Sequence, residues 1–333
     1  MFDAILLVSF GGPEGMADVE PFLQNVLRGK NVPLARMQEV IKHYERFGGV
    51  SPLNKNMRAL IAALKEDLTR HEISLPIYWG NRNWHPLLTD TVPRMHRDGV
   101  GRALAFATSA YSSYSGCRQY LEDIERARSV VGDEAPMIEK IRPFFNHPLF
   151  IEVNVSHLRE ALDMVPAESR ERTHVAFTAH SLPLSMAKTC SYEAQLNETA
   201  RLVAEELNLR DWKVVYQSRS GPPAQPWLEP DILDHLRVLS AQSVESVVVA
   251  PIGFIFDHME VIFDLDIQAR QLCDECGLNM VRASTAASSP RFVTMVRELL
   301  EERLLDKRVR SFVGDLGPCP DRCPSQCCPA PSA

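Results

Sequence analysis

The 333-residue chain has no long apolar run and no cluster of basic residues. A helix that crosses a bilayer needs about 20 consecutive apolar residues, and none of the apolar runs approaches that length. The net charge is −7, whereas a protein that binds nucleic acid needs a concentrated basic face. The composition therefore argues against membrane insertion and against nucleic acid as the main partner.

The N-terminus also lacks the basic stretch that begins a signal peptide. Residues 1–10 are mostly apolar (MFDAILLVSF), but they run directly into Gly11, Gly12 and Pro13. An apolar run that ends so soon at a turn is typical of a buried first strand rather than of a secretion signal. We therefore expect a cytoplasmic protein.

Cysteine is rare except near the C-terminus. Four of the eight cysteines, here called the tail cysteines, are Cys319, Cys323, Cys327 and Cys328. In a cytosolic chain, clustered cysteines more often bind metal than form disulfides. A separate Cys-x-x-Cys pair at positions 273 and 276 falls within a helical pattern, and we interpret it as structural.

What is present is the composition of a globular protein of more than one domain. Apolar residues make up 45% and charged residues 24%, and a single core rarely grows beyond about 250–300 residues. Short β-branched runs alternate with longer amphipathic stretches, a pattern that favours an α/β fold with parallel sheets covered by helices on both faces. Strands are predicted at residues 4–10, 77–80, 103–108, 174–178, 213–217, 246–252 and 279–282, and helices at 57–69, 119–131, 193–207, 231–241, 261–276 and 290–305.

The alternation occurs twice along the chain. A first unit is expected over residues 1–145 and a second over 146–310, followed by a cysteine-rich tail over 311–333. Pro143 and Pro148 interrupt regular structure near the proposed boundary. The duplication is one of architecture, because no short-period sequence repeat is visible.

Polar and glycine-rich loops follow several of the predicted strands. In open α/β sheets, ligands bind outside the carboxyl ends of the strands. We therefore expect these loops to line a shared cleft. They are residues 11–13, 109–116, 179–183 and 253–258.

An acidic segment follows one of the strands of the second unit. If a helix begins here, Asp257, Glu260 and Asp264 lie at i, i+3 and i+7 on one face. Such carboxylates suit a divalent cation, and an added imidazole shifts the preference toward iron and its neighbours. The alternative is a solvated acidic face near a helix N-terminus, where the helix dipole favours such residues in any case.

His180 lies at the end of the first strand of the second unit. Its ordinary pKa, near about 6.5, allows it to accept a proton at neutral pH. A histidine in this position is otherwise a structural residue. Opposite an acidic helix end, however, it suits a reaction that removes protons from nitrogen while a cation is delivered.

Four segments, taken in order, resemble those of ferrochelatases. Residues 177–183 (FTAHSLP) and 251–260 (PIGFIFDHME) are similar to the two signature segments of that family. Two further segments match, one at 216–222 (YQSRSGP) with 227–230 (WLEP) and one at 47–54 (FGGVSPLN). The similarity runs from residue 3 to about residue 305. It implies two Rossmann-like domains of the chelatase type and the insertion of Fe²⁺ into a porphyrin.

The resemblance assigns the metal chemistry to the second unit. His180 and Glu260 would be the pair that handles the metal, with His180 accepting the pyrrole protons and Glu260 guiding the ion. Asp257 and Asp264 would extend the acidic path for iron or protons; each is otherwise an ordinary acid on a helix surface.

The same resemblance assigns ring contacts to the first unit. Ser51 and Tyr120 would contact the tetrapyrrole, and Tyr44 and Arg28 lie in matching segments that would reach the propionates, although an exposed solubilising role is the alternative for Arg28. Some bacterial members carry an iron-ligating tyrosine after the first strand, where this chain has Phe10. Phenylalanine cannot coordinate iron, so Phe10 is expected to pack against the porphyrin or to fill the core.

The details of two segments bear on the substrate. Residues 78–84 (YWGNRNW) and 108–114 (TSAYSSY) are most similar to those of actinobacterial-type enzymes, which act on coproporphyrin III. The sequence shows no long apolar lip that would dock on a membrane and collect protoporphyrin IX. Coproporphyrin III is therefore the expected substrate, with protoporphyrin IX as the alternative.

The tail cysteines are expected to hold a [2Fe–2S] cluster, because several ferrochelatases carry such a cluster on a similar tail and four thiolates satisfy it. Cys327 and Cys328 are adjacent, so Cys117 or Cys190 could supply the fourth ligand. The alternatives are zinc, which also accepts four thiolates, and a disordered, redox-sensitive tail.

Two other classes of function remain open. One is a carrier or sensor that binds tetrapyrrole without catalysis, and the other is a chelatase for cobalt or nickel. We expect a monomer, and a haem-processing enzyme is a candidate partner for the product.

Overall fold

The computed structural model describes residues 1–29, 34–221, 224–324 and 326–330. The chain divides into two compact units, each assembled from several segments. The segments of unit 1 are Met1–Thr108, Gln119–Ile141 and Val296–Lys307, and those of unit 2 are Ser109–Arg118, Arg142–Met295 and Arg308–Ala333.

Unit 1 contains a four-stranded parallel sheet in the order β2-β1-β3-β4. All six residues of β1 are buried, as expected for a central strand covered on both faces. The strands are β1 (Ala4–Ser9), β2 (Ile77–Asn81), β3 (Arg102–Ala107) and β4 (Met137–Lys140).

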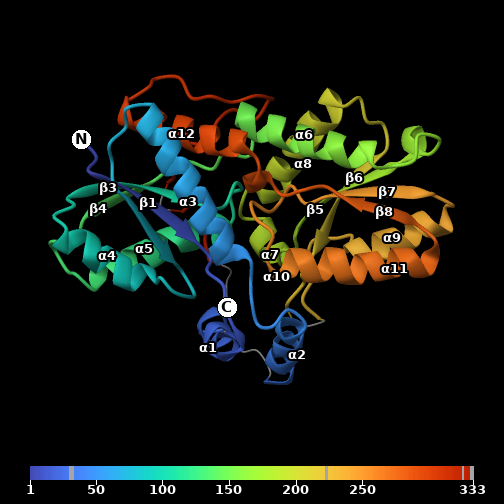
Figure 1. Cartoon of the computed structure of the whole chain (residues 1–333), viewed down its shortest axis with the longest axis horizontal. Coiled ribbons are helices and arrows are strands. Elements are labelled where there is room, and N and C mark those ends of the chain that lie inside the picture. The colour runs from blue at the N-terminus through green and yellow to red at the C-terminus, as the bar shows by residue number, and fades with distance from the viewer. Residues whose placement is uncertain (30–33, 222–223, 325, 331–333) are drawn as a thin grey trace. The chain divides into compact units, whose positions relative to one another are not determined.

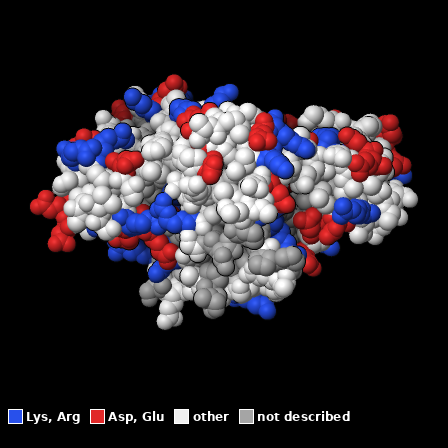
Figure 2. Space-filling view, turned by 90° about the horizontal axis from the view of Figure 1, so that it is seen from below, with Lys and Arg blue, Asp and Glu red and all other residues white. Residues whose placement is uncertain are grey.

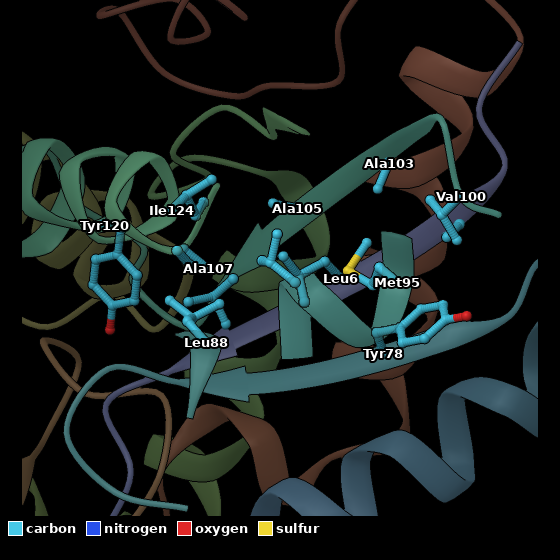
Figure 3. Close-up of a cluster of buried hydrophobic side chains, with 14 residues drawn as sticks. Leu6, Tyr78, Leu88, Met95, Val100, Ala103, Ala105, Ala107, Tyr120 and Ile124 are labelled. Atoms are coloured by element: carbon cyan, nitrogen blue, oxygen red, sulfur yellow. The ribbon is translucent and has the colours of Figure 1, made fainter. Parts of the chain in front are cut away.

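Helices cover both faces of this sheet. In Figure 1, α3 lies on one side and α4 and α5 lie on the other. Figure 3 shows apolar side chains of α4 and α5 packed against alternate residues of the strands, among them Leu88, Met95 and Ile124. Burial of each large side chain contributes about 1.5–3 kcal/mol. The helices that begin in this part of the chain are α1 (Met16–Val26), α2 (Leu34–Glu45), α3 (Leu53–Arg70), α4 (Leu88–Arg97) and α5 (Gln119–Ser129).

Unit 2 contains a second four-stranded parallel sheet, in the equivalent order β6-β5-β7-β8. Figure 1 shows α6 and α8 on one side of it and α9 and α11 on the other. The strands are β5 (His174–His180), β6 (Trp212–Gln217), β7 (Ser246–Ala250) and β8 (Asn279–Arg282). The α-helices are α6 (Pro148–Asp163), α7 (Leu184–Ala187), α8 (Tyr192–Glu206), α9 (Ile232–Ala241), α10 (Met259–Val261), α11 (Arg270–Cys276) and α12 (Pro290–Leu304), the last of which continues into unit 1.

Within the described ranges, short helices of other types complete the elements. Two are π-helices, η1 (Tyr114–Arg118) and η3 (Ile262–Ala269), and two are 3₁₀ turns, η2 (Arg170–Arg172) and η4 (Ala286–Ser288). The α-helix predicted over residues 261–276 is therefore wrong in its first half, which is η3. Isolated π-helical segments are frequent at functional sites.

The predicted fold class, two parallel sheets each flanked by helices, is confirmed. The strand β4 was not predicted, because its four residues include Glu139 and Lys140 and it lies at the edge of its sheet. No helix within the described part of the chain is long and apolar enough to cross a membrane. On the face seen in Figure 2, basic and acidic side chains are interspersed.

Candidate functional site

His180, the last residue of β5, faces the carboxylate of Glu260 in α10. The distance from His180 Nε2 to Glu260 Oε2 is 3.7 Å, and the two side chains are 31% and 52% exposed. His180 Nδ1 lies 2.6 Å from the carbonyl oxygen of Ser181. A carbonyl can only accept, so Nδ1 carries the proton, and in the neutral ring Nε2 presents its lone pair toward Glu260.

A close backbone approach holds the loop of Glu260 against the strand of His180. The amide of Gly253 donates to the carbonyl of Thr178 at 3.0 Å. A Cβ atom on Gly253 would lie 2.5 Å from the Cβ of Ala179 and 2.6 Å from its Cα. Only glycine allows this contact, which gives a physical reason for the glycine in the segment 251–260.

A second carboxylate, that of Asp264 in η3, lies beside this pair. It accepts hydrogen bonds from the hydroxyl of Ser218 and, at 3.4 Å, from the amide of Gln217. Gln217 also donates to the carbonyl of Glu260 at 3.3 Å. Ser218 has a φ of 61°, a left-handed conformation that is uncommon outside glycine and often marks a functional position.

The environment raises the pKa of both His180 and Asp264. Burial alone lowers the pKa of His180, but the negative charge and hydrogen bond of Glu260 outweigh burial and leave the pKa above its ordinary value. Burial raises the pKa of Asp264, and repulsion by Glu260 adds to this; the hydrogen bond from Ser218 opposes it, and the result is about 6. Glu260 therefore contributes to raising the pKa of both neighbouring groups, the imidazole of His180 and the carboxyl of Asp264.

Asp257 does not share a helix face with the other two carboxylates. The helix begins at Met259, so Asp257 precedes it. The guanidinium of Arg282 binds Asp257 at 3.0 Å and Asp266 at 2.6 Å. The predicted ladder of three acids on one face is thus wrong, because this ion pair directs Asp257 toward β8.

In unit 1, aromatic side chains gather where the chain leaves β1. Phe10 is 38% exposed and packs edge to face on Phe22, with ring centroids 6.2 Å apart. Phe22 packs in the same way on Tyr44, at 6.1 Å. The guanidinium of Arg82 lies 5.8 Å from the ring of Phe10 and 4.6 Å from that of Tyr120. We call Phe10, Phe22, Tyr44 and Tyr120 the aromatic wall.

Ser51 and Arg28 lie near the same strand end. Ser51 is buried, and a Cβ atom on Gly12 would lie 2.7 Å from its hydroxyl oxygen. Arg28 donates to the side chain of Asn25 at 2.6 Å, and Asn25 donates to the carbonyl of Asn83, whose amide binds the carbonyl of Phe10. Ser51, Tyr44 and Tyr120 therefore lie near the carboxyl end of β1, whereas Arg28 is connected to it only through Asn25 and Asn83.

The tail cysteines do not all share the same neighbours. The thiol of Cys323 interacts with those of Cys117 and Cys327, and Cys327 Sγ lies 3.6 Å from Cys328 Sγ. Cys319 instead lies 3.4 Å from the amide of Gln195. Cys117 thus interacts with the tail cysteines, whereas Cys319 has other neighbours.

Across the residues whose structure is described, no three His, Cys, Asp or Glu side chains are arranged so as to hold a metal ion. His180 and Glu260 offer two ligands and leave the other positions open, an arrangement suited to an ion that is passed on rather than stored. The neighbouring carboxyl groups can accept protons.

A family model for ferrochelatase matches residues 2–304. The chain belongs to the ferrochelatase family. A ferrochelatase of Rhodopirellula baltica is 55% identical, with 98% of this chain and 93% of the relative covered. A coproporphyrin III ferrochelatase of Nocardia farcinica is 51% identical over 91% of this chain and 88% of its own. One from Streptomyces coelicolor is 48% identical over 99% and 94%.

Solved chelatase structures share the fold of this ferrochelatase family member. SirB from Bacillus subtilis, determined with Fe³⁺, has a TM-score of 0.56 at 14% identity and covers 91% of this chain and 97% of its own. The sirohydrochlorin chelatase SirB of a B. subtilis subspecies, in complex with cobalt, has a TM-score of 0.52 at 13% identity, with the same coverage. At this identity the likeness concerns the fold alone.

Sequence reasoning missed the roles of Gln217, Ser218 and Arg282 in this site. Gln217 and Ser218 lie in the segment 216–222, directly after a predicted strand, so their position was a usable signal. Arg282 ends a predicted strand, and nothing local indicates that it pairs with an acid 25 residues away.

Proposed function

We propose that this protein inserts Fe²⁺ into coproporphyrin III to form Fe-coproporphyrin in haem biosynthesis. Membership in the ferrochelatase family supports metal insertion, and relatives at 46–51% identity are named coproporphyrin III ferrochelatases. The observation that carries the proposal is the pair formed by His180 Nε2 and Glu260 Oε2, 3.7 Å apart.

In the proposed reaction, Fe²⁺ forms bonds to the pyrrole nitrogens and two protons leave the ring. His180 accepts the two protons at Nε2 one after the other, each passed on before the next is taken, because Nδ1 is already committed to the carbonyl of Ser181. The resulting imidazolium is stabilised by the carboxylate of Glu260. Asp264, with its pKa of about 6, is suited to pass a proton onward to solvent.

Iron delivery falls to the same carboxylates. Glu260 is half exposed and can exchange the water ligands of the incoming ion for its own oxygens. Asp264 extends this path, whereas Asp257 is neutralised by Arg282 and acts by holding the loop in place. Binding energy from the rest of the porphyrin can distort the ring by about 1–5 kcal/mol and turn nitrogen lone pairs toward iron.

The aromatic wall and its neighbours in unit 1 are proposed to contact the porphyrin. Phe10 offers an exposed apolar face to the porphyrin, Tyr120 supports this surface through Arg82, and Ser51 contributes a hydroxyl beside Gly12. Arg28 and Tyr44 would reach propionates, since a guanidinium binds carboxylates through paired hydrogen bonds.

Anaerobic assays of Fe²⁺ insertion into coproporphyrin III and into protoporphyrin IX test this proposal. Turnover should be greater with coproporphyrin III. A preference for protoporphyrin IX would contradict the proposed substrate but not the proposed ferrochelatase activity. Insertion of cobalt or nickel but not of iron would show that the proposed metal is wrong. Porphyrin binding without metal insertion would show that the protein is a carrier rather than an enzyme.

We also propose that the tail holds a [2Fe–2S] cluster, with Cys117, Cys323, Cys327 and Cys328 as ligands. Contacts among these thiols support this set over one that includes Cys319, and Cys190 acts on Cys328 electrostatically. Such a cluster would supply a redox-sensitive group.

Protein purified without oxygen should show visible absorbance from the cluster, together with two irons and two sulfides per chain. Cys117→Ser should abolish the absorbance, and Cys276→Ser, at an exposed position on α11, should not. Bound zinc in place of iron, or absorbance that survives Cys117→Ser, would contradict the proposal.

We further propose a cytoplasmic monomer that passes its product to a haem-processing enzyme. The absence of any spanning helix among the described residues is compatible with this location. Sedimentation of the purified protein at a single-chain mass of 37.5 kDa would support the monomer, and a larger species would contradict it.

A further inference from the structure

Two buried tyrosines of unit 2 contact the segments that carry His180 and Glu260, and neither has a role in the chemistry described above. Tyr111 follows β3 in the chain, and Tyr192 is the first residue of α8. They are only 2% and 6% exposed. Their rings pack edge to face with centroids 6.0 Å apart and an interplanar angle of 81°. Such pairs are favourable and geometrically specific.

The hydroxyl of each tyrosine is bound to a different catalytic loop. Tyr192 donates to the carbonyl of His180 at 3.0 Å. Tyr111 donates to the carbonyl of Ile252 at 3.0 Å, in the loop that leads to Glu260. The two hydrogen bonds and the ring contact therefore connect the backbone of His180 with the loop that carries Glu260.

The segments that carry the two tyrosines are also fastened to each other. The side-chain oxygen of Gln195, on α8, accepts from the amide of Ser112 at 2.7 Å. The amide nitrogen of Gln195 donates to the hydroxyl of Ser112 at 3.0 Å. Phe150 also packs edge to face on Tyr111, with ring centroids 6.3 Å apart. These contacts restrict the movement of the two tyrosines relative to each other.

Both hydroxyls keep their protons in the working range of an enzyme. Burial raises the pKa of Tyr111 and of Tyr192 well above the ordinary tyrosine value. Each group therefore remains a donor, and neither can act as a proton acceptor in the reaction. Their contribution is geometric.

We propose that Tyr111 and Tyr192 are positioning residues that set the separation and orientation of His180 and Glu260. The inference rests on the proposed function, because it assumes that this pair performs metal insertion. A deviation of about 0.5 Å or 10–20° is enough to impair a catalytic arrangement, and backbone hydrogen bonds at both loops restrict such movement.

The test uses Tyr192→Phe, Tyr111→Phe and the double variant, each of which removes a hydroxyl and keeps the ring. Tyr78→Phe is the matched control, since Tyr78 is 8% exposed and donates to Asp98 at 2.8 Å in the core of unit 1. Anaerobic Fe²⁺ insertion should show kcat reduced about three- to tenfold in each single variant, with KM for porphyrin unchanged. Tyr78→Phe should retain the kcat of the natural protein.

A second measurement separates positioning from general loss of structure. When Tyr192→Phe is introduced into a His180→Ala background, it should have no further effect on the residual rate, since there is no imidazole left to position. An equal loss in both backgrounds, or single variants that match Tyr78→Phe, would overturn the inference. If His180→Ala itself retained full activity, the proposed function would fail instead.

Discussion

The two sheets of this protein have the same strand order but carry different side chains at the carboxyl ends of their strands. In unit 1 the last paired residues of the two neighbouring strands are Ser9 and Asn81, and in unit 2 they are His180 and Gln217. Each sheet therefore places a buried amide at the end of its edge strand. The residue at the end of the adjacent central strand is a serine in one unit and a histidine in the other.

The partners of the two amides explain the difference. Asn81 donates to the side chain of Asn54 and to the carbonyl of His85, so its polar atoms bind other neutral groups. Gln217 donates to the carbonyl of Glu260 and to the carboxylate of Asp264. One framework thus supports a mostly buried aromatic cluster in unit 1 and a set of titratable groups in unit 2.

The comparison predicts that removal of the His180 imidazole has the largest effect on the rate of metal insertion. His180→Ala should lower kcat for Fe²⁺ insertion by about 10²–10⁴-fold, the usual contribution of a general base. Porphyrin affinity, followed by fluorescence quenching, should remain. His71→Ala, at an exposed histidine after α3, is the control. Turnover that survives His180→Ala would show that the imidazole of unit 2 is not needed for metal insertion.

Glu260→Gln should change both the rate and its dependence on pH. Activity requires neutral His180 and so rises with pH through the pKa of His180. The carboxylate of Glu260 raises that pKa; without its charge the pKa falls, and the acidic limb of the pH–rate profile should move to lower pH while the plateau drops. Glu275→Gln, at an exposed acid on α11, should leave the profile unchanged. A limb that stays in place would contradict the coupling.

Gly253→Ala tests whether the loop that carries Glu260 must lie close to the end of β5. The added methyl group would overlap Ala179, which should reduce the free energy of unfolding by about 1–3 kcal/mol and lower kcat as Glu260 moves away from His180. Gly15→Ala is the matched control, because nothing lies within 4 Å of its added Cβ. Chemical denaturation and the insertion assay measure both effects. Equal stability of the two variants would show that the close approach is not needed.

Phe10→Ala should have the smallest effect and one of a different kind. Loss of an aromatic contact should raise KM for the porphyrin about three- to tenfold and leave kcat nearly unchanged. Phe10→Tyr, which keeps the ring, should bind porphyrin normally. A fall in kcat at constant KM would place Phe10 with the catalytic groups and break the contrast between the units.

Much of the fold could be predicted because its signals are local. The predicted strand at residues 279–282 coincides with β8, and the start of β5 was also correct. Alternation of apolar strands with amphipathic helices depends only on neighbouring residues. The helices over Pro148–Asp163 and Leu88–Arg97 were missed, because prolines at or near their starts and, in α4, within the helix mask the pattern.

The sequence by itself determined which residues stand at the strand ends, and with them the family and the candidates His180 and Glu260. Only the tertiary structure decided which acids accompany that pair. Asp264 accepts a hydrogen bond from Ser218, 46 residues away in the chain. Asp257 forms an ion pair with Arg282, 25 residues away, and this pair directs it toward β8. Periodicity reports on the next few residues of a chain, whereas the partner of a charge is set by whatever the folded backbone brings beside it.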